Sequence, residues 1–254
     1  MLRFAYSTIN WGDTCDLPLT FAEIQQAGWK ATELFAHTLD WLGTPSHLKT
    51  VMNGLIPATL FGSVDLPVSE RQRTVHQHRI EFAAELGAED YGLVGGGRLR
   101  QRAPSASDIH DLAHLCESLA SYGATMGVTV AYHPHTGCTV ETEAEIDALM
   151  NETQALTLCL DVSHIAVVGE DPVSHLRKYR TRLGYVHLKD WTAGAFTELG
   201  RGTLGIDFPA ILRELEAQHF NKWVVVEQSR SDVSPLRSAQ TNADYLRGIG
   251  YSIA

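Results

Sequence analysis

The sequence lacks closely spaced cysteines. Its 254 residues include four cysteines that form no Cys-x-x-Cys pair, namely Cys15, Cys116, Cys138 and Cys159. A zinc ribbon or a disulfide framework needs cysteines at short or regular spacing, so neither is expected. The scatter predicts a reduced protein of the cytoplasm.

Basic charge and long apolar runs are scarce as well. Lys and Arg total 20 against 30 Asp and Glu, which gives a formal charge of −10. Because nucleic-acid affinity depends largely on neutralising phosphates, no nucleic-acid partner is predicted. No apolar stretch approaches the roughly 20 residues of a membrane span, and the sequence from Met1 has no export-signal pattern. We therefore expect no association with membranes.

The Gly-x-Gly-x-x-Gly turn of dinucleotide-binding sheets is also absent. The first strand-like segment runs into Trp11-Gly12-Asp13-Thr14-Cys15, and the glycines of Gly95–Gly97 lack the required spacing. An open Rossmann-type sheet is therefore the weaker of the two parallel α/β architectures.

Eight short apolar segments alternate with longer segments of helical period, with no linker between them. Strict alternation predicts parallel strands, and the length is near the ~250 residues of a TIM barrel. We predict one (β/α)8 barrel domain over residues 1–254. Its strands are expected near Arg3–Asn10, Ala31–Leu34, Ala58–Phe61, Tyr91–Val94, Thr129–His133, Leu156–Asp161, Gly184–His187 and Trp223–Glu227.

Polar residues gather where these strands end, which is where parallel barrels carry their active sites. Four of them, on successive strands, are expected to converge: His133, Asp161, His187 and Glu227. Two imidazoles and two carboxylates suit Mn²⁺, Co²⁺, Zn²⁺ or Fe²⁺ better than Mg²⁺ or Ca²⁺. The pattern predicts one divalent metal ion at the barrel mouth, with His135 as the substitute ligand if His133 points away.

Further polar residues surround this point. His135, His164 and Lys189 each follow a predicted ligand by two or three residues, and Glu33 ends the second strand. They are expected to bind substrate hydroxyls or to move protons. Two other interpretations remain open: a helix-start hydrogen bond for His164, and a surface ion pair of Lys189 with Asp190.

Loop residues are candidates for contacts with the substrate. Arg98 follows three glycines that allow close backbone approach, although Arg100 and Arg102 lie in the same loop. Trp11, like Trp191, either stacks on a sugar-like ligand or packs in the core. Asp190 either contacts the substrate or is a solvated loop charge.

Four further histidines lie inside predicted helices, far from the strand ends. His110 and His114 have the i, i+4 spacing of metal ligands, but no HExxH glutamate accompanies them. We expect surface positions for all of them: His76, His78, His110 and His114.

With these residues considered together, the chain resembles the xylose-isomerase-like barrel superfamily of sugar isomerases, epimerases and dehydratases. Within that superfamily it is most similar to the inosose (2-keto-myo-inositol) dehydratases. The resemblance covers nearly the whole chain. It rests on GVTVAYHPHTG (127–137), LDVSH (160–164), VHLKD (186–190), ELGRG (198–202) and WVVVEQ (223–228).

The resemblance implies roles for single residues. Asp161, His187 and Glu227 match metal-ligand positions of the superfamily, whereas His133 replaces a glutamate that most members carry. That replacement resembles the inosose dehydratase branch and disfavours an epimerase mechanism with paired glutamates. Positions that contact substrate in related dehydratases are matched by Glu33, His135, His164, Lys189 and Arg98.

These observations predict a metal-dependent lyase that dehydrates a polyhydroxylated cyclic ketone. A metal would polarise the ketone, an α-proton would leave to give an enediolate, and the β-hydroxyl would depart as water, with His135, His164, Lys189 or Glu227 as acid or base. A keto-sugar isomerase or epimerase would share the enediolate and is the main alternative. A non-catalytic sugar binder is a third, and an endonuclease is disfavoured by the charge of −10. A homo-oligomer remains open.

Overall fold

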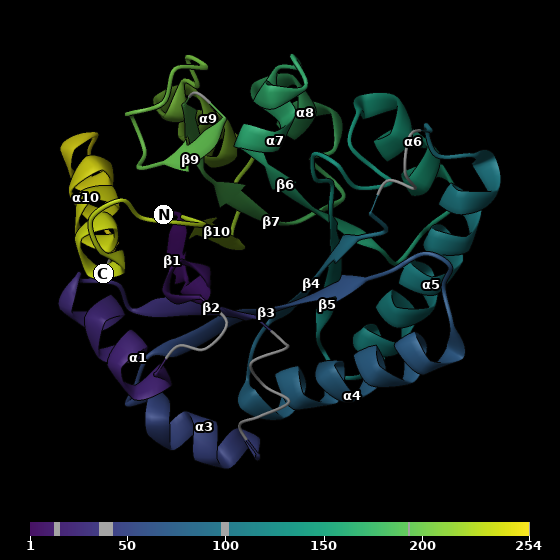
Figure 1. Cartoon of the computed structure of the whole chain (residues 1–254), viewed down its shortest axis with the longest axis horizontal. Coiled ribbons are helices and arrows are strands. Elements are labelled where there is room, and N and C mark those ends of the chain that lie inside the picture. Colours follow the sequence, from purple (N-terminus) through teal and green to yellow (C-terminus); the bar gives the residue numbers. More distant parts are fainter. Residues whose placement is uncertain (13–15, 36–42, 98–101, 193, 254) are drawn as a thin grey trace.

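The computed structural model describes residues 1–12, 16–35, 43–97, 102–192 and 194–253. Eight parallel strands close into a barrel in the order β1-β10-β7-β6-β5-β4-β3-β2 (Figure 1). The predicted (β/α)8 class is therefore confirmed. The barrel strands are β1 (Arg3–Ser7), β2 (Ala31–Phe35), β3 (Ile56–Val64), β4 (Asp90–Gly95), β5 (Thr129–His133), β6 (Thr157–Asp161), β7 (Leu183–Leu188) and β10 (Trp223–Val226).

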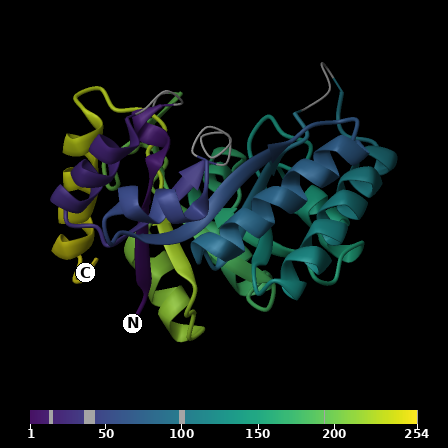
Figure 2. The ribbon, with the colours of Figure 1, turned by 90° about the horizontal axis from the view of Figure 1, so that it is seen from below.

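Helices form the outer layer around these strands (Figure 1), and both labelled chain ends lie at the lower left of Figure 2. None of the helices in the described ranges combines the length and hydropathy needed to cross a membrane. The helices are α1 (Leu17–Gln26), α3 (Pro45–Met52), α4 (Glu70–Leu86), α5 (Ala106–Thr125), α6 (Glu143–Asn151), α7 (Val162–Val167), α8 (Pro172–Lys178), α9 (Phe208–Ala217) and α10 (Pro235–Gly248).

Two local features differ from the predicted strands. The first strand ends at Ser7 rather than Asn10, because the Ser7 hydroxyl accepts a hydrogen bond from the Ile9 amide (3.4 Å) and starts the 3-10 helix η1 (Thr8–Trp11). The sequence pattern also missed an antiparallel hairpin after β7, formed by β8 (Asp190–Thr192) and β9 (Ala195–Thr197). Strands of three residues are too short to show a period.

The barrel interior is filled by small residues beside a few large rings. Alanines from β1, β2, β3 and β5 pack with Phe61, Tyr185 and Trp223. Gly92 on β4 provides space for them, because a Cβ atom there would lie 2.0 Å from Tyr185 Oη and 2.3 Å from Phe61 Cδ2. This tight packing closes the inside of the barrel and leaves the strand ends as the place for a site.

His76 corrects one surface prediction. It is 2% exposed, with Nδ1 2.7 Å from Tyr91 Oη and Nε2 3.1 Å from the Ser63 carbonyl oxygen. His76 precedes the buried Ile80 by four residues and so shares the inward stripe of α4. Its hydrogen bonds satisfy the buried ring. The other three histidines of that group are exposed, as expected: His78, His110 and His114.

Asp90, at the start of β4, gives a pH-dependent prediction. It is fully buried and neither oxygen has a hydrogen-bond partner among the described residues, so burial raises its pKa from 3.8 to about 7. Between these pH values the unfolded chain loses this proton while the folded protein keeps it, so stability falls as pH rises. As the pH rises from 4 to 8, we expect the free energy of unfolding of Asp90→Asn to increase by on the order of 1–4 kcal/mol relative to that of wild type.

Melting temperatures of both proteins at pH 4 and pH 8 test this expectation. The exposed Asp111, changed to Asn, serves as the control and should show no such pH-dependent gain. The expectation would be contradicted if the difference in melting temperature between Asp90→Asn and wild type were the same at both pH values.

Candidate metal centre

Four side chains at the ends of neighbouring barrel strands converge on one point. His133 ends β5, Asp161 ends β6, His187 lies near the end of β7, and Glu227 follows β10. Asp161 and His187 are paired in register, as are His187 and Val225. One potential ligand atom of each of the four residues lies within 4.8 Å of those of the others. The structure thus brings together the side chains predicted to hold a metal.

The donor atoms of this cluster fit a divalent ion. Asp161 Oδ1 caps α7 by accepting the Ser163 amide (2.8 Å), whereas the buried Oδ2 has no hydrogen-bond partner in the described ranges. His187 Nδ1 lies 2.8 Å from Glu227 Oε2 without the geometry of a hydrogen bond. A shared ion would explain why these two potential ligand atoms lie close together without a hydrogen bond. Two imidazoles and two carboxylates suit Mn²⁺, Co²⁺ or Zn²⁺.

Lys189 adds a buried positive charge beside the cluster. Its Nζ contacts Glu227 Oε1, lies 3.7 Å from Asp161 Oδ2 and sits 4.0 Å from the centre of the Phe196 ring. Burial opposes its charge, but Glu227 and Asp161 outweigh this and raise the pKa of Lys189. Burial likewise opposes the charge of Glu227, yet Lys189 and His187 hold the pKa of Glu227 well below its usual range. A surface ion pair of Lys189 with Asp190 is excluded, since both residues are buried.

His135 and His164 lie next to His133, with the centroids of their two rings 3.7 Å apart and the ring planes inclined by 41°. His164 Nδ1 lies 2.9 Å from Thr136 Oγ1, and its buried Nε2 has no hydrogen-bond partner in the described ranges. Burial, followed in effect by the charge of Lys189, lowers the pKa of His164. Burial also lowers the pKa of His135. Both rings are therefore unprotonated at neutral pH.

The ligand atoms of His133, His135 and His164 also lie within 4.8 Å of one another. His133 directs Nδ1 at the Cys159 carbonyl oxygen (3.3 Å), which leaves Nε2 for other contacts. His135 thus shares a group of potential ligands with His133 and His164, separate from the group that holds Asp161, His187 and Glu227.

Glu33 lies behind the cluster rather than in the open mouth. The carboxylate is 0% exposed, and its Oε2 accepts the Thr59 hydroxyl at 2.7 Å and lies 3.0 Å from His187 Nε2. Glu33 thus contacts Thr59 on the adjacent strand β3 and His187 on β7, across the barrel.

The other residues expected to contact substrate differ in placement. Trp11 directs Nε1 at Glu23 Oε2 (2.5 Å) and packs edge-on against Tyr6, so its polar end faces α1. Asp190 is buried, and its carboxylate accepts the backbone N–H groups of Trp191, Gly200 and Gly202. It organises the hairpin loop and is not a solvated charge. Arg98 lies outside the described residues.

A cavity of about 370 Å³ opens onto the cluster from the barrel mouth. The ligand side contributes His133 and Glu227, and His135 lies beside them. Sequence reasoning missed the rest of this wall, which combines apolar and polar side chains; the only available signal was their position after strand-like segments. These residues include Ile9, Phe35, Phe61, Asp65, Val94, Cys138 and Ser229.

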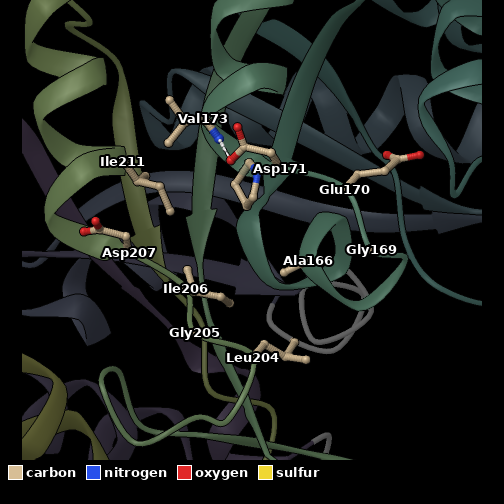
Figure 3. Close-up of a pocket in the computed structure, with 11 residues that line it drawn as sticks. Ala166, Gly169, Glu170, Asp171, Val173, Leu204, Gly205, Ile206, Asp207 and Ile211 are labelled. Carbon is tan, nitrogen blue, oxygen red and sulfur yellow. Dashed lines mark hydrogen bonds between the residues drawn. The ribbon is translucent and has the colours of Figure 1, made fainter.

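A second cavity, of about 360 Å³, lies between α8 and the start of α9 (Figure 3). Two of its acidic residues are helix caps: Asp171 accepts the Val173 amide (3.1 Å), and Asp207 accepts the Ala210 amide (2.9 Å). The third, Glu170, accepts the Glu143 amide (3.0 Å) and lies 2.9 Å from His175 Nε2. These carboxylates already have partners, and among the described residues no group of potential metal ligands lies there. The barrel mouth is therefore the candidate site.

The fold and the strand-end cluster are those of a (β/α)8 barrel with a polar mouth, and sequence comparison identifies its family. The family model described as xylose isomerase-like TIM barrel matches residues 21–249. The chain therefore belongs to this family.

Known proteins resemble the chain over different lengths. It is 34% identical to an inosose dehydratase of Geobacillus kaustophilus, with 96% of this chain and 93% of that protein covered. It is 33% identical to an inosose dehydratase of Clostridium botulinum, but that match covers 54% of this chain and only 53% of the relative. Among solved structures, a 3-keto-D-glucoside 4-epimerase from E. coli has the same fold, with a TM-score of 0.80, 19% identity, and 98% and 100% of the two chains covered.

Proposed function

We propose that this chain is a metal-dependent hydro-lyase that dehydrates a polyhydroxylated cyclic ketone such as 2-keto-myo-inositol. One observation carries the proposal: the four-residue ligand cluster opens through His133 and Glu227 onto a cavity that His135 also lines, and the buried Lys189 ammonium group contacts Glu227. The similarity to inosose dehydratases supports the choice of substrate class. The buried thiols of Cys116 and Cys159 suit the expected cytoplasmic location.

A divalent ion held by His133, Asp161, His187 and Glu227 would polarise the ketone and acidify the neighbouring C–H bond. The chain's own groups would then move the protons. A neutral imidazole, His135 or His164, accepts the α-proton. Burial lowers the pKa of both rings and so keeps them unprotonated before this step. The Lys189 ammonium group donates a proton to the departing β-hydroxyl, which leaves as water. Transfer of the imidazolium proton back to Lys189 restores the starting state.

The reaction class is tested with 2-keto-myo-inositol in deuterated water. Protein loaded with Mn²⁺ or Co²⁺ should release a product that is lighter than the substrate by one water, apart from deuterium gained at exchangeable positions. A conjugated product should also absorb in the ultraviolet. Protein without added ion, after treatment with a chelator, is the control and should be inactive.

Two other outcomes would point to different functions. Deuterium incorporation at carbon without loss of water or a new chromophore would identify a keto-sugar isomerase or epimerase, which shares the enediolate. Binding of keto-polyols without any turnover would identify a sugar-binding protein. Either result would contradict the dehydratase.

A further inference from the structure

A buried hydrogen-bonded chain runs from β3 through β2 to the ligand cluster. Thr59 Oγ1 donates to Glu33 Oε2 (2.7 Å), and the same oxygen lies 3.0 Å from His187 Nε2. All three residues are 0% exposed. Glu33 and Thr59 are also paired in register across β2 and β3, directly after a shift in that pairing at Thr32. The carboxylate is thus held from one side and faces the imidazole on the other.

We propose that Glu33 is a positioning residue that fixes the tautomer and orientation of His187, so that Nδ1 of this ring faces the ion. This role goes beyond the proposed reaction, because it concerns the strength of ion binding and does not depend on the substrate.

The geometry around His187 distinguishes its two nitrogens. Nδ1 faces Glu227 Oε2 at 2.8 Å without hydrogen-bond geometry, as expected for two atoms that point at a common ion. Nε2 faces the Glu33 carboxylate, which only accepts hydrogen bonds. A neutral imidazole carries one N–H, so an acceptor at Nε2 places that N–H there and leaves the lone pair on Nδ1.

The reversed tautomer would be costly in this environment. Its Nε2 lone pair would face a buried carboxylate oxygen 3.0 Å away, and its Nδ1–H would occupy the side of the ion. A carboxylate behind a metal-bound imidazole also raises the basicity of the ligand, and losing such a partner typically weakens ion binding about 10–100-fold. Thr59 contributes by fixing which way the carboxylate points.

Two substitutions separate the charge of Glu33 from its shape. In Glu33→Gln the amide oxygen can still accept from Thr59 and His187, and the amide nitrogen takes the place of Oε1, which has no hydrogen-bond partner among the described residues. In Glu33→Leu both contacts are lost. Glu198→Leu is the matched control, because Glu198 is a mostly buried carboxylate that accepts from Ser238 Oγ (2.7 Å) and belongs to none of the ligand groups.

The test is a Co²⁺ titration in competition with a chelator, together with the visible spectrum of bound Co²⁺. We expect a Kd raised about 10–100-fold and an altered spectrum in Glu33→Leu, with a smaller rise in Glu33→Gln. Glu198→Leu should bind Co²⁺ like wild type. If Glu33→Leu does not fold, Glu33→Gln and Thr59→Val carry the test, and both should weaken binding.

The results separate this inference from the proposed function. Unchanged Co²⁺ affinity in the folded Glu33 variants, with a raised KM for the ketone, would overturn the positioning role and restore a substrate contact. Weaker Co²⁺ binding in a protein that never dehydrates a ketone would support the inference and remove the proposed reaction. A wild-type chain that binds no Co²⁺ would overturn both.

Discussion

Replacement of Asp161 by alanine is expected to remove both the bound ion and the activity. The substitution deletes Oδ2, a potential ligand atom that accepts no hydrogen bond from the described residues. Loss of an outer partner already weakens ion binding about 10–100-fold, so loss of a ligand should lower affinity and turnover by more than that. Elemental analysis of the purified variant and its rate on 2-keto-myo-inositol provide the measurement.

The control must account for the second role of Asp161, since its Oδ1 also caps α7. Asp171 caps α8 in the same way, accepting the amides of Val173 and Ser174, but belongs to none of the ligand groups. Asp171→Ala should cost about 1 kcal/mol of stability and leave ion content unchanged. Normal ion content in Asp161→Ala would show that this residue is not a ligand.

Replacement of Lys189 by methionine is expected to lower turnover while the bound ion is kept. Methionine keeps much of the apolar volume under Phe196 but removes the proton donor and the positive charge 3.7 Å from Asp161 Oδ2. Turnover should fall about 10²–10⁴-fold, the usual contribution of a positioned acid or base. Ion content should at least equal that of wild type, because a competing cation is gone.

Lys178→Met is the matched control, since Lys178 pairs with Glu143 and Asp147 on the surface of the barrel. It should change neither ion content nor rate, because exposed ion pairs contribute little. Normal turnover in Lys189→Met would remove this lysine from the mechanism, and loss of the ion would mean that it helps to build the cluster.

The convergence of the ligand cluster could be predicted because it follows from strand order alone. Parallel strands of a barrel end at one rim, so polar residues that terminate successive strands must meet. His133 and Asp161 are the final residues of β5 and β6. This rule needs only the approximate end of each strand, which the alternation of apolar segments supplies.

The direction in which single side chains point could not be predicted in the same way. Glu33 turns toward His187 because Thr59 holds it, and that pairing depends on a register shift between β2 and β3 that leaves no sequence signal. Asp190 is buried because the segment after the short hairpin brings the Gly200 and Gly202 amides onto its carboxylate. Contacts of this kind depend on tertiary packing, which periodicity does not encode.

The distribution of the ligand cluster over four strands has a thermodynamic consequence. His133, Asp161, His187 and Glu227 come from β5, β6, β7 and β10, so they are close together only when that side of the barrel is assembled. An ion that binds the folded but not the unfolded chain raises the free energy of unfolding. The increase is about 2.7 kcal/mol at a free ion concentration 100 times its Kd. The melting temperature of the proposed holoprotein would therefore rise with the concentration of free ion.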